Sequence, residues 1–141
     1  MTDTARRILM AILMLGVAGI SVELWLLDHV EDAYQLIPMG LNAAAVLVAA
    51  LVAMRPSMAT LRLFQAVMLL MMVSGAAGVW LHYQVNTEFQ LEMDPQLSGL
   101  ALFRKSIVAK APPALAPGAM VQLGLIGLAY TFRHPASARR G

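Results

Sequence analysis

The sequence predicts an all-α integral membrane protein, a bundle of four transmembrane helices with both termini in the cytoplasm and a long outer loop before the last helix. Composition and pattern both lead to this prediction. Hydrophobic residues make up 60% of the 141 residues and charged residues only 13%, whereas soluble domains average about 45–50% and about 25%. The hydrophobic residues gather in four runs that basic residues flank. A chain of this length fits a single membrane domain, 1–141.

The four runs predict the transmembrane helices, since a bilayer core about 30 Å thick requires roughly 20 helical residues. The first run, 8–27, contains one charged residue, Glu23, near its end. The runs 37–54 and 63–81 contain none. The fourth, 117–132, would reach only about 24 Å at a rise of 1.5 Å per residue. This last helix therefore begins earlier in the sequence or ends below the outer surface.

Prolines and arginines mark the ends of the runs. Pro38 lies near the expected first turn of the second helix, where its missing N–H costs no hydrogen bond. Arg55 and Pro56 follow the end of the same run. An alternative interpretation of the first run is a signal peptide, because residues 17–19, VAG, resemble a cleavage site. We expect an uncleaved anchor, since the run is long enough to cross the bilayer.

The distribution of charge predicts the orientation in the membrane. Seven basic residues lie on one side of the predicted helices and three on the other. The first group is Arg6, Arg7, Arg55, Arg62, Arg133, Arg139 and Arg140. The positive-inside rule then places both termini, with the basic tail 133–141, on the cytoplasmic side of the plasma (inner) membrane. Nucleic acid is excluded as a partner, because the net charge is only +2 and the basic residues form no stripe.

Cysteine is absent, which excludes disulfides, thiolate metal sites, iron–sulfur clusters and thiol redox chemistry. No intramembrane serine or aspartate protease motif is present either. The sequence therefore requires no cofactor, and it favours a protein that is not an enzyme.

Glu23 lies within the first hydrophobic run, and ionisable residues inside a membrane face protein or water. Gly16 and Gly19 precede it at helical spacing, so we expect these three residues to share the face that packs in the bundle. The helical rise places Glu23 and His82 in the outer third of the membrane, where the two side chains can meet.

Two interpretations of Glu23 and His82 as a pair remain open, besides side chains that simply face lipid or reach to the interface. The first is a structural hydrogen bond that joins two helices. The second is a protonatable or ligand-binding site that opens outward, with Asn42 and Gln122 as neighbouring hydrogen-bonding groups.

A metal site is a further candidate, because histidine and carboxylate side chains gather on the outer side. His29, Asp32, His82 and Glu92 are the candidate ligands. Their spacing matches no ligand motif, neither HExxH nor an EF-hand loop. Histidine could also bind a tetrapyrrole such as haem, but one histidine per helix is a weak indication. Solvated loop side chains are the simpler interpretation.

The outer loop, 82–116, is too long for a plain connection. Residues 85–94 alternate between hydrophobic and polar, which predicts an extended segment, although a prolonged third helix also fits the spacing. A single strand would either lie on the bundle with its acidic edge in water or pair with another chain. In the second case Phe89, Leu91 and Met93 are candidate partner-docking residues.

A short helix should follow this segment. Asp94 and Pro95 match an N-cap and a first turn, and Pro112 with Pro113 would end the helix. Its basic residues, Arg104 among them, suit lipid headgroups, which predicts an interfacial helix. A loop helix that simply covers the bundle is the alternative.

These features lead to two hypotheses of function. The first is an accessory, structural or assembly subunit of a larger membrane complex, with other membrane subunits and the bilayer as partners. The second is a small homo-oligomeric bundle that binds or transports a ligand through the outer site at Glu23 and His82. Absence of an inverted repeat disfavours transport by a single copy.

Overall fold

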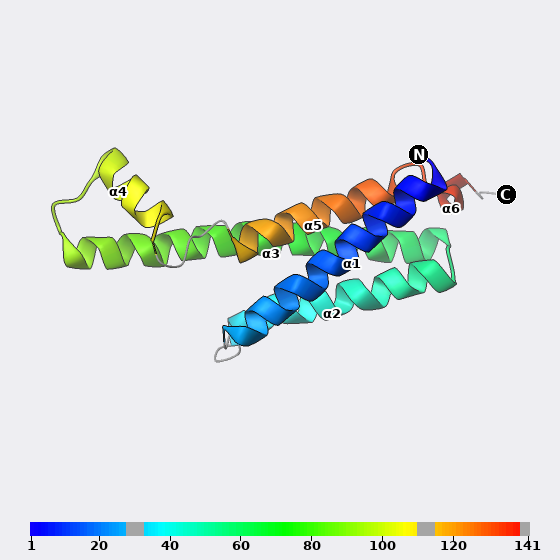
Figure 1. Cartoon of the computed structure of the whole chain (residues 1–141), viewed down its shortest axis with the longest axis horizontal. Helices are drawn as coiled ribbons and strands as arrows, with labels where there is room; N and C mark the ends of the chain where they lie inside the picture. Colours follow the sequence, from blue (N-terminus) through cyan, green and yellow to red (C-terminus); the bar gives the residue numbers. More distant parts are fainter. Residues whose placement is uncertain (28–32, 110–114, 139–141) are drawn as a thin grey trace.

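The protein is all-helical in the computed structural model, which describes residues 1–27, 33–109 and 115–138. In chain order the helices are α1 (Asp3–Leu26), α2 (Ala33–Met54), α3 (Met58–Met93), α4 (Gly99–Ile107), α5 (Ala116–Thr131) and α6 (Pro135–Ala138). Four of them, α1, α2, α3 and α5, form a bundle, and both termini lie at one end of it (Figure 1).

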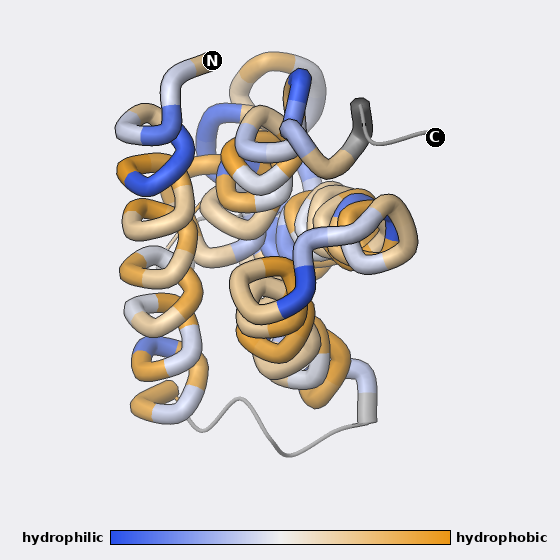
Figure 2. Tube along the Cα trace, turned by 90° about the vertical axis from the view of Figure 1, so that its right-hand side faces the viewer, coloured by the Kyte–Doolittle hydropathy of each residue, from blue (hydrophilic) through white to orange (hydrophobic). Residues whose placement is uncertain are grey.

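Three helices are long and hydrophobic enough to cross a membrane. They are α1, residues Tyr34–Met54 of α2, and α3, with mean hydropathies of 2.1, 2.2 and 1.8. Hydrophobic residues lie on the outward as well as the inward sides of these helices (Figure 2). Leu15, Leu47 and Val73, for example, are 77%, 66% and 67% exposed. Such all-round hydrophobicity is typical of helices surrounded by lipid.

Local hydrogen bonds determine where these helices begin. The Thr2 hydroxyl accepts from the Ala5 backbone N–H at 3.2 Å, so α1 starts before the hydrophobic run. Ser57 and Thr60 form a capping box that starts α3, each side chain accepting from the backbone N–H of the other. Pro38 lies inside α2 rather than in its first turn, because α2 already begins at Ala33.

The prediction of an extended segment at 85–94 is wrong, because α3 continues without a break to Met93. A helix satisfies its backbone groups internally, whereas an isolated strand would leave them unpaired. The 36 residues of α3 reach about 54 Å at 1.5 Å per residue, well beyond a bilayer core of about 30 Å. The second half of α3 therefore projects past the bundle, with α4 beside it (Figure 1).

The predicted start of the short helix at Asp94 is also wrong. The Asp94 carboxylate accepts from the backbone N–H of Gln96 at 3.2 Å, which closes a turn instead of opening a helix. Helix α4 begins only at Gly99, whose φ of +56° lies in the left-handed region that favours glycine. The helix ends at Ile107, and the prolines expected to end it lie outside the described residues.

The tightest packing in the bundle joins α3 to α5 at glycines. A Cβ on Gly75 would lie 2.5 Å from the Pro117 carbonyl oxygen, and one on Gly124 would lie 2.6 Å from the Met68 carbonyl oxygen. A Cβ on Gly127 would collide with the Met68 side chain. Only glycine lets the two backbones come this close.

Small residues and a few polar ones lie on the packing faces of α2 and α5. Asn42, Ala45 and Ala49 are buried on α2, and Met120, Gly124, Gly127 and Thr131 are buried on α5. In α1, by contrast, Gly19 and Glu23 are exposed. The buried residues of α1 are Leu13, Val17, Ile20 and Leu24. Larger aliphatic side chains make more van der Waals contacts with neighbouring helices than glycine does, so they decide which face of α1 packs against α2 and α5.

Replacing Gly124 with alanine tests the close approach of α3 and α5. The added methyl group would meet backbone, which cannot move as a flexible side chain can. We expect the G124A variant to lose about 1–3 kcal/mol of unfolding free energy, measured by circular dichroism in detergent micelles. Gly19→Ala is the matched control, since nothing lies within 4 Å of its new Cβ. A G124A variant as stable as the G19A variant would contradict this packing.

Candidate functional site

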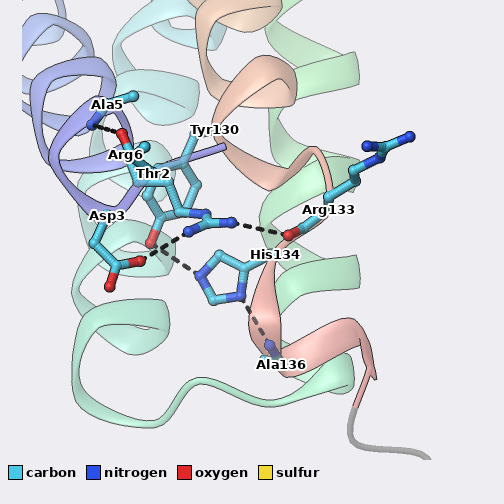
Figure 3. Close-up of polar contacts among 8 residues, drawn as sticks. All are labelled: Thr2, Asp3, Ala5, Arg6, Tyr130, Arg133, His134 and Ala136. Carbon is cyan, nitrogen blue, oxygen red and sulfur yellow. Dashed lines mark hydrogen bonds and ion pairs between the residues drawn. The ribbon is translucent and has the colours of Figure 1, made fainter.

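Polar side chains come together where the two ends of the chain meet (Figure 3). Arg6 of α1 is only 8% exposed. Its Nη1 lies 2.9 Å from Asp3 Oδ1, and its Nη2 donates to the backbone carbonyl oxygen of Arg133 at 2.9 Å. The guanidinium thus connects the first turn of α1 to the segment that follows α5.

The turn after α5 presents this carbonyl group to Arg6. Arg133 has a φ of +49°, which is uncommon for a residue other than glycine. Its own guanidinium lies 5.3 Å from the centre of the Phe132 ring and points away from the site (Figure 3). The charged hydrogen bond from Arg6 offsets part of the cost of this backbone conformation.

His134 lies beside the Arg6 guanidinium and is 9% exposed. Its Nδ1 accepts from the backbone N–H of Ala136 at 3.2 Å, so a neutral ring carries its proton on Nε2. Nε2 lies 3.5 Å from the Tyr130 hydroxyl oxygen. Burial lowers the pKa of His134 below its ordinary value of 6.5, and the positive charge of Arg6 lowers it further, against a smaller opposing effect of Asp3.

A groove of about 500 Å³ adjoins this cluster. Arg6 and Arg7 line it at the end of α1, and Met10, Met14 and Ala53 line it between α1 and α2. Tyr130 of α5 also contributes to the lining. The groove therefore combines cationic groups with a hydrophobic wall.

The structure does not bring Glu23 and His82 together. Glu23 is exposed near the end of α1, and His82 is half-buried on α3. In the described part of the chain α1 packs against α2 and α5, not against α3. The two residues thus share no site within one copy, and a role for either one in ligand or proton binding stays a prediction.

Asn42 connects α1 and α2 instead of lining an outer cavity. It is 1% exposed, and its Nδ2 donates to Ser21 Oγ at 3.2 Å. Ser21 Oγ in turn donates to the Val17 carbonyl oxygen at 2.7 Å. Asn42 Oδ1 is buried and accepts no hydrogen bond from the described residues. Gln122 is exposed on α5, a helix that does not pack against α2 in the described ranges.

The candidate metal ligands are not gathered either. His29 and Asp32 lie outside the described residues. His82 and the exposed Glu92 are ten residues apart on α3, which separates them by about 15 Å along the helix axis. The described residues contain no group of three His, Asp or Glu side chains that could hold a metal ion.

The candidate docking residues lie on a helix rather than a strand. Phe89 and Met93 share one face of α3 and are 55% and 71% exposed, whereas Leu91 is half-buried. Their docking role stays a prediction.

Sequence reasoning missed the cluster of Arg6, Tyr130 and His134. In the sequence Arg6 is one of the basic residues that flank a hydrophobic run, and nothing there relates residue 6 to residue 133. The one local signal was the spacing of three between Asp3 and Arg6, which suits an ion pair on a helix.

Comparisons of the chain with protein-family models, with curated proteins and with solved structures find no match.

The lowered pKa of His134 predicts that acid destabilises the fold. The unfolded chain takes up the proton first as the pH falls through 6.5, and the loss of stability stops below the folded-state pKa. We expect the melting temperature in micelles to fall as the pH is lowered through 6.5. His134→Asn keeps an acceptor near the Ala136 N–H and should reduce this fall. An equal fall in both proteins would contradict the assignment.

Proposed function

We propose that the chain is a non-catalytic integral membrane protein, an accessory or assembly subunit that binds another membrane protein. The contact is made by the arm, defined as residues 80–109, which comprises the end of α3 together with α4. The main support for the proposal is that α3 projects from the bundle. This helix is far longer than a bilayer core requires.

Contacts between α3 and α4 make the arm a defined structure. Ser106 is fully buried, and its carbonyl oxygen accepts from Asn86 Nδ2 at 3.1 Å. Its hydroxyl group lies 3.1 Å from Thr87 Oγ1. The rings of Tyr83 and Phe103 lie 6.0 Å apart. An arm held in this way is ordered before a partner binds, which reduces the entropic cost of binding.

A hydrophobic stripe runs along the arm on α3. Leu81, Val85, Phe89 and Met93 follow at a spacing of four and are 55%, 64%, 55% and 71% exposed. Lipid accounts for exposed hydrophobic residues in the bundle, but α3 reaches beyond the thickness of the bilayer core. Stripes of this spacing are the usual contacts of a helix that docks into a groove.

The topology belongs to the same proposal. Helix α5 forms a fourth span, both termini are cytoplasmic in the plasma (inner) membrane, and the arm lies on the outer side with α4 at the membrane surface. The excess of basic residues near the termini supports this orientation. At 16 residues α5 reaches about 24 Å, so local thinning of the bilayer accommodates it.

The geometry gives no comparable support to a ligand-binding or transport bundle. Glu23 is exposed, and in the described residues α1 does not pack against α3, the helix that carries His82. It lies one turn from the end of α1, close enough for its carboxylate to reach the interface.

A double substitution in the stripe tests the binding role. We expect the protein purified from its native membrane to carry a second subunit at fixed stoichiometry, measured by native mass spectrometry. Val85→Ser with Phe89→Ser should weaken this complex roughly thirtyfold, the effect of losing about 2 kcal/mol at one hot spot. Gln84→Ser, an exposed polar position on the arm, is the control. A protein that purifies alone, or a complex equally stable in both variants, would refute the proposal.

Single cysteines test the topology, because the chain has none of its own. A cysteine in place of Gln96, in the turn before α4, should react with a membrane-impermeant maleimide in intact cells. A cysteine in place of Thr2 should react only after lysis. Both residues are exposed, so the maleimide can reach either cysteine unless the membrane separates them. Labelling of both sites in intact cells would contradict the proposed orientation.

A further inference from the structure

We infer that the groove between α1 and α2 binds one phospholipid with an anionic headgroup. The lipid phosphate lies at Arg6 and Arg7, and an acyl chain follows the hydrophobic wall. The inference requires membrane insertion but not the binding role of the arm.

The shape of the groove follows from how α1 and α2 are arranged. They are joined near one end by Asn42 and Ser21, and they diverge toward the end with the termini (Figure 1). Met10, Met14 and Ala53 line the space that opens between them. Its volume, about 500 Å³, lies within the roughly 300–1,000 Å³ of ordinary ligand sites.

The charges at the groove suit an anion. Arg7 is exposed and forms no ion pair within the described part of the chain. Arg6 already holds an anion, because Asp3 Oδ1 lies 2.9 Å from its Nη1. Guanidinium groups bind carboxylates and phosphates with the same geometry. The Asp3 side chain is 85% exposed, so a phosphate can replace it at little cost.

A second observation concerns Arg6 itself. Its Nε is buried and has no acceptor among the described residues. A buried guanidinium with an unused donor is costly unless negative charge lies close to it. A phosphate carries its negative charge on several oxygens. It therefore offsets the positive charge of the Arg6 guanidinium better than the single Asp3 carboxylate oxygen beside Nη1 does.

The hydrophobic wall distinguishes a phospholipid from a free anion. Inorganic phosphate would engage only the arginines, whereas a phospholipid also covers Met10, Met14 and Ala53. These residues belong to helices that are hydrophobic enough to lie in a membrane. The hydrocarbon that surrounds such helices is the acyl chains of lipids, so an acyl chain can fill the groove.

Native mass spectrometry of the purified full chain tests the site, with dioleoyl phosphatidylglycerol as the probe. We expect phosphatidylglycerol to bind more tightly than dioleoyl phosphatidylcholine, with inorganic phosphate unable to compete. Arg7→Gln should weaken phosphatidylglycerol binding about fivefold, the effect of one basic residue near a charged lipid surface. Arg7→Lys should retain most of the affinity.

Further variants separate a site from general attraction. Asp3→Asn removes the competing carboxylate and should strengthen binding. Ala53→Phe fills the groove from an exposed position and should weaken it without loss of charge. Arg62→Gln removes an exposed arginine from the start of α3 and should have no effect. Equal binding of both lipids, weaker binding by the D3N variant, or equal losses in the R62Q and R7Q variants would overturn the inference. Helicity by circular dichroism confirms that each variant is folded.

Discussion

The close approach of α3 and α5 is the constraint on which the rest of the bundle depends. Gly75 and Gly124 let the two backbones touch, and Gly127 leaves room for the Met68 side chain, so α5 lies directly against α3. Helix α1 then packs on α5 and α2 and is kept away from α3. A side chain at these glycines would push α5 outward and displace α1 with it. The same arrangement separates Glu23 from His82 and brings Arg6 to the turn after α5.

Backbone hydrogen bonding explains why the arm is helical. Residues 85–94 satisfy both a period of two and a spacing of four, so side-chain pattern alone does not choose between strand and helix. A strand needs a neighbour, and the described chain has no other strand to pair with. Continuing α3 satisfies every backbone group locally and provides the surface on which α4 packs. One consequence is a projecting arm whose exposed stripe supports the proposed binding role.

Polar residues in this protein are used chiefly to join helices. Asn42 with Ser21 connects α1 to α2, and Gln65 Nε2 donates to Thr131 Oγ1 at 3.0 Å between α3 and α5. Arg6 connects the two ends of the chain. Within hydrophobic surroundings such bonds contribute about 1 kcal/mol each, enough to fix relative position. The groove beside Arg6 is different. It combines an arginine without an ion pair in the described chain, Arg7, with an exposed hydrophobic wall.

The sequence by itself determined the helical class and the places of the hydrophobic runs, because these depend on local composition and spacing. Only the tertiary structure decided which face of α1 is buried, since Leu13 and Val17 compete with Gly19 for the same neighbours. It also decided that residue 6 meets residue 133, a contact that no local spacing encodes. Burial and long-range hydrogen bonds depend on what lies opposite a residue, and that is known only once the helices are packed.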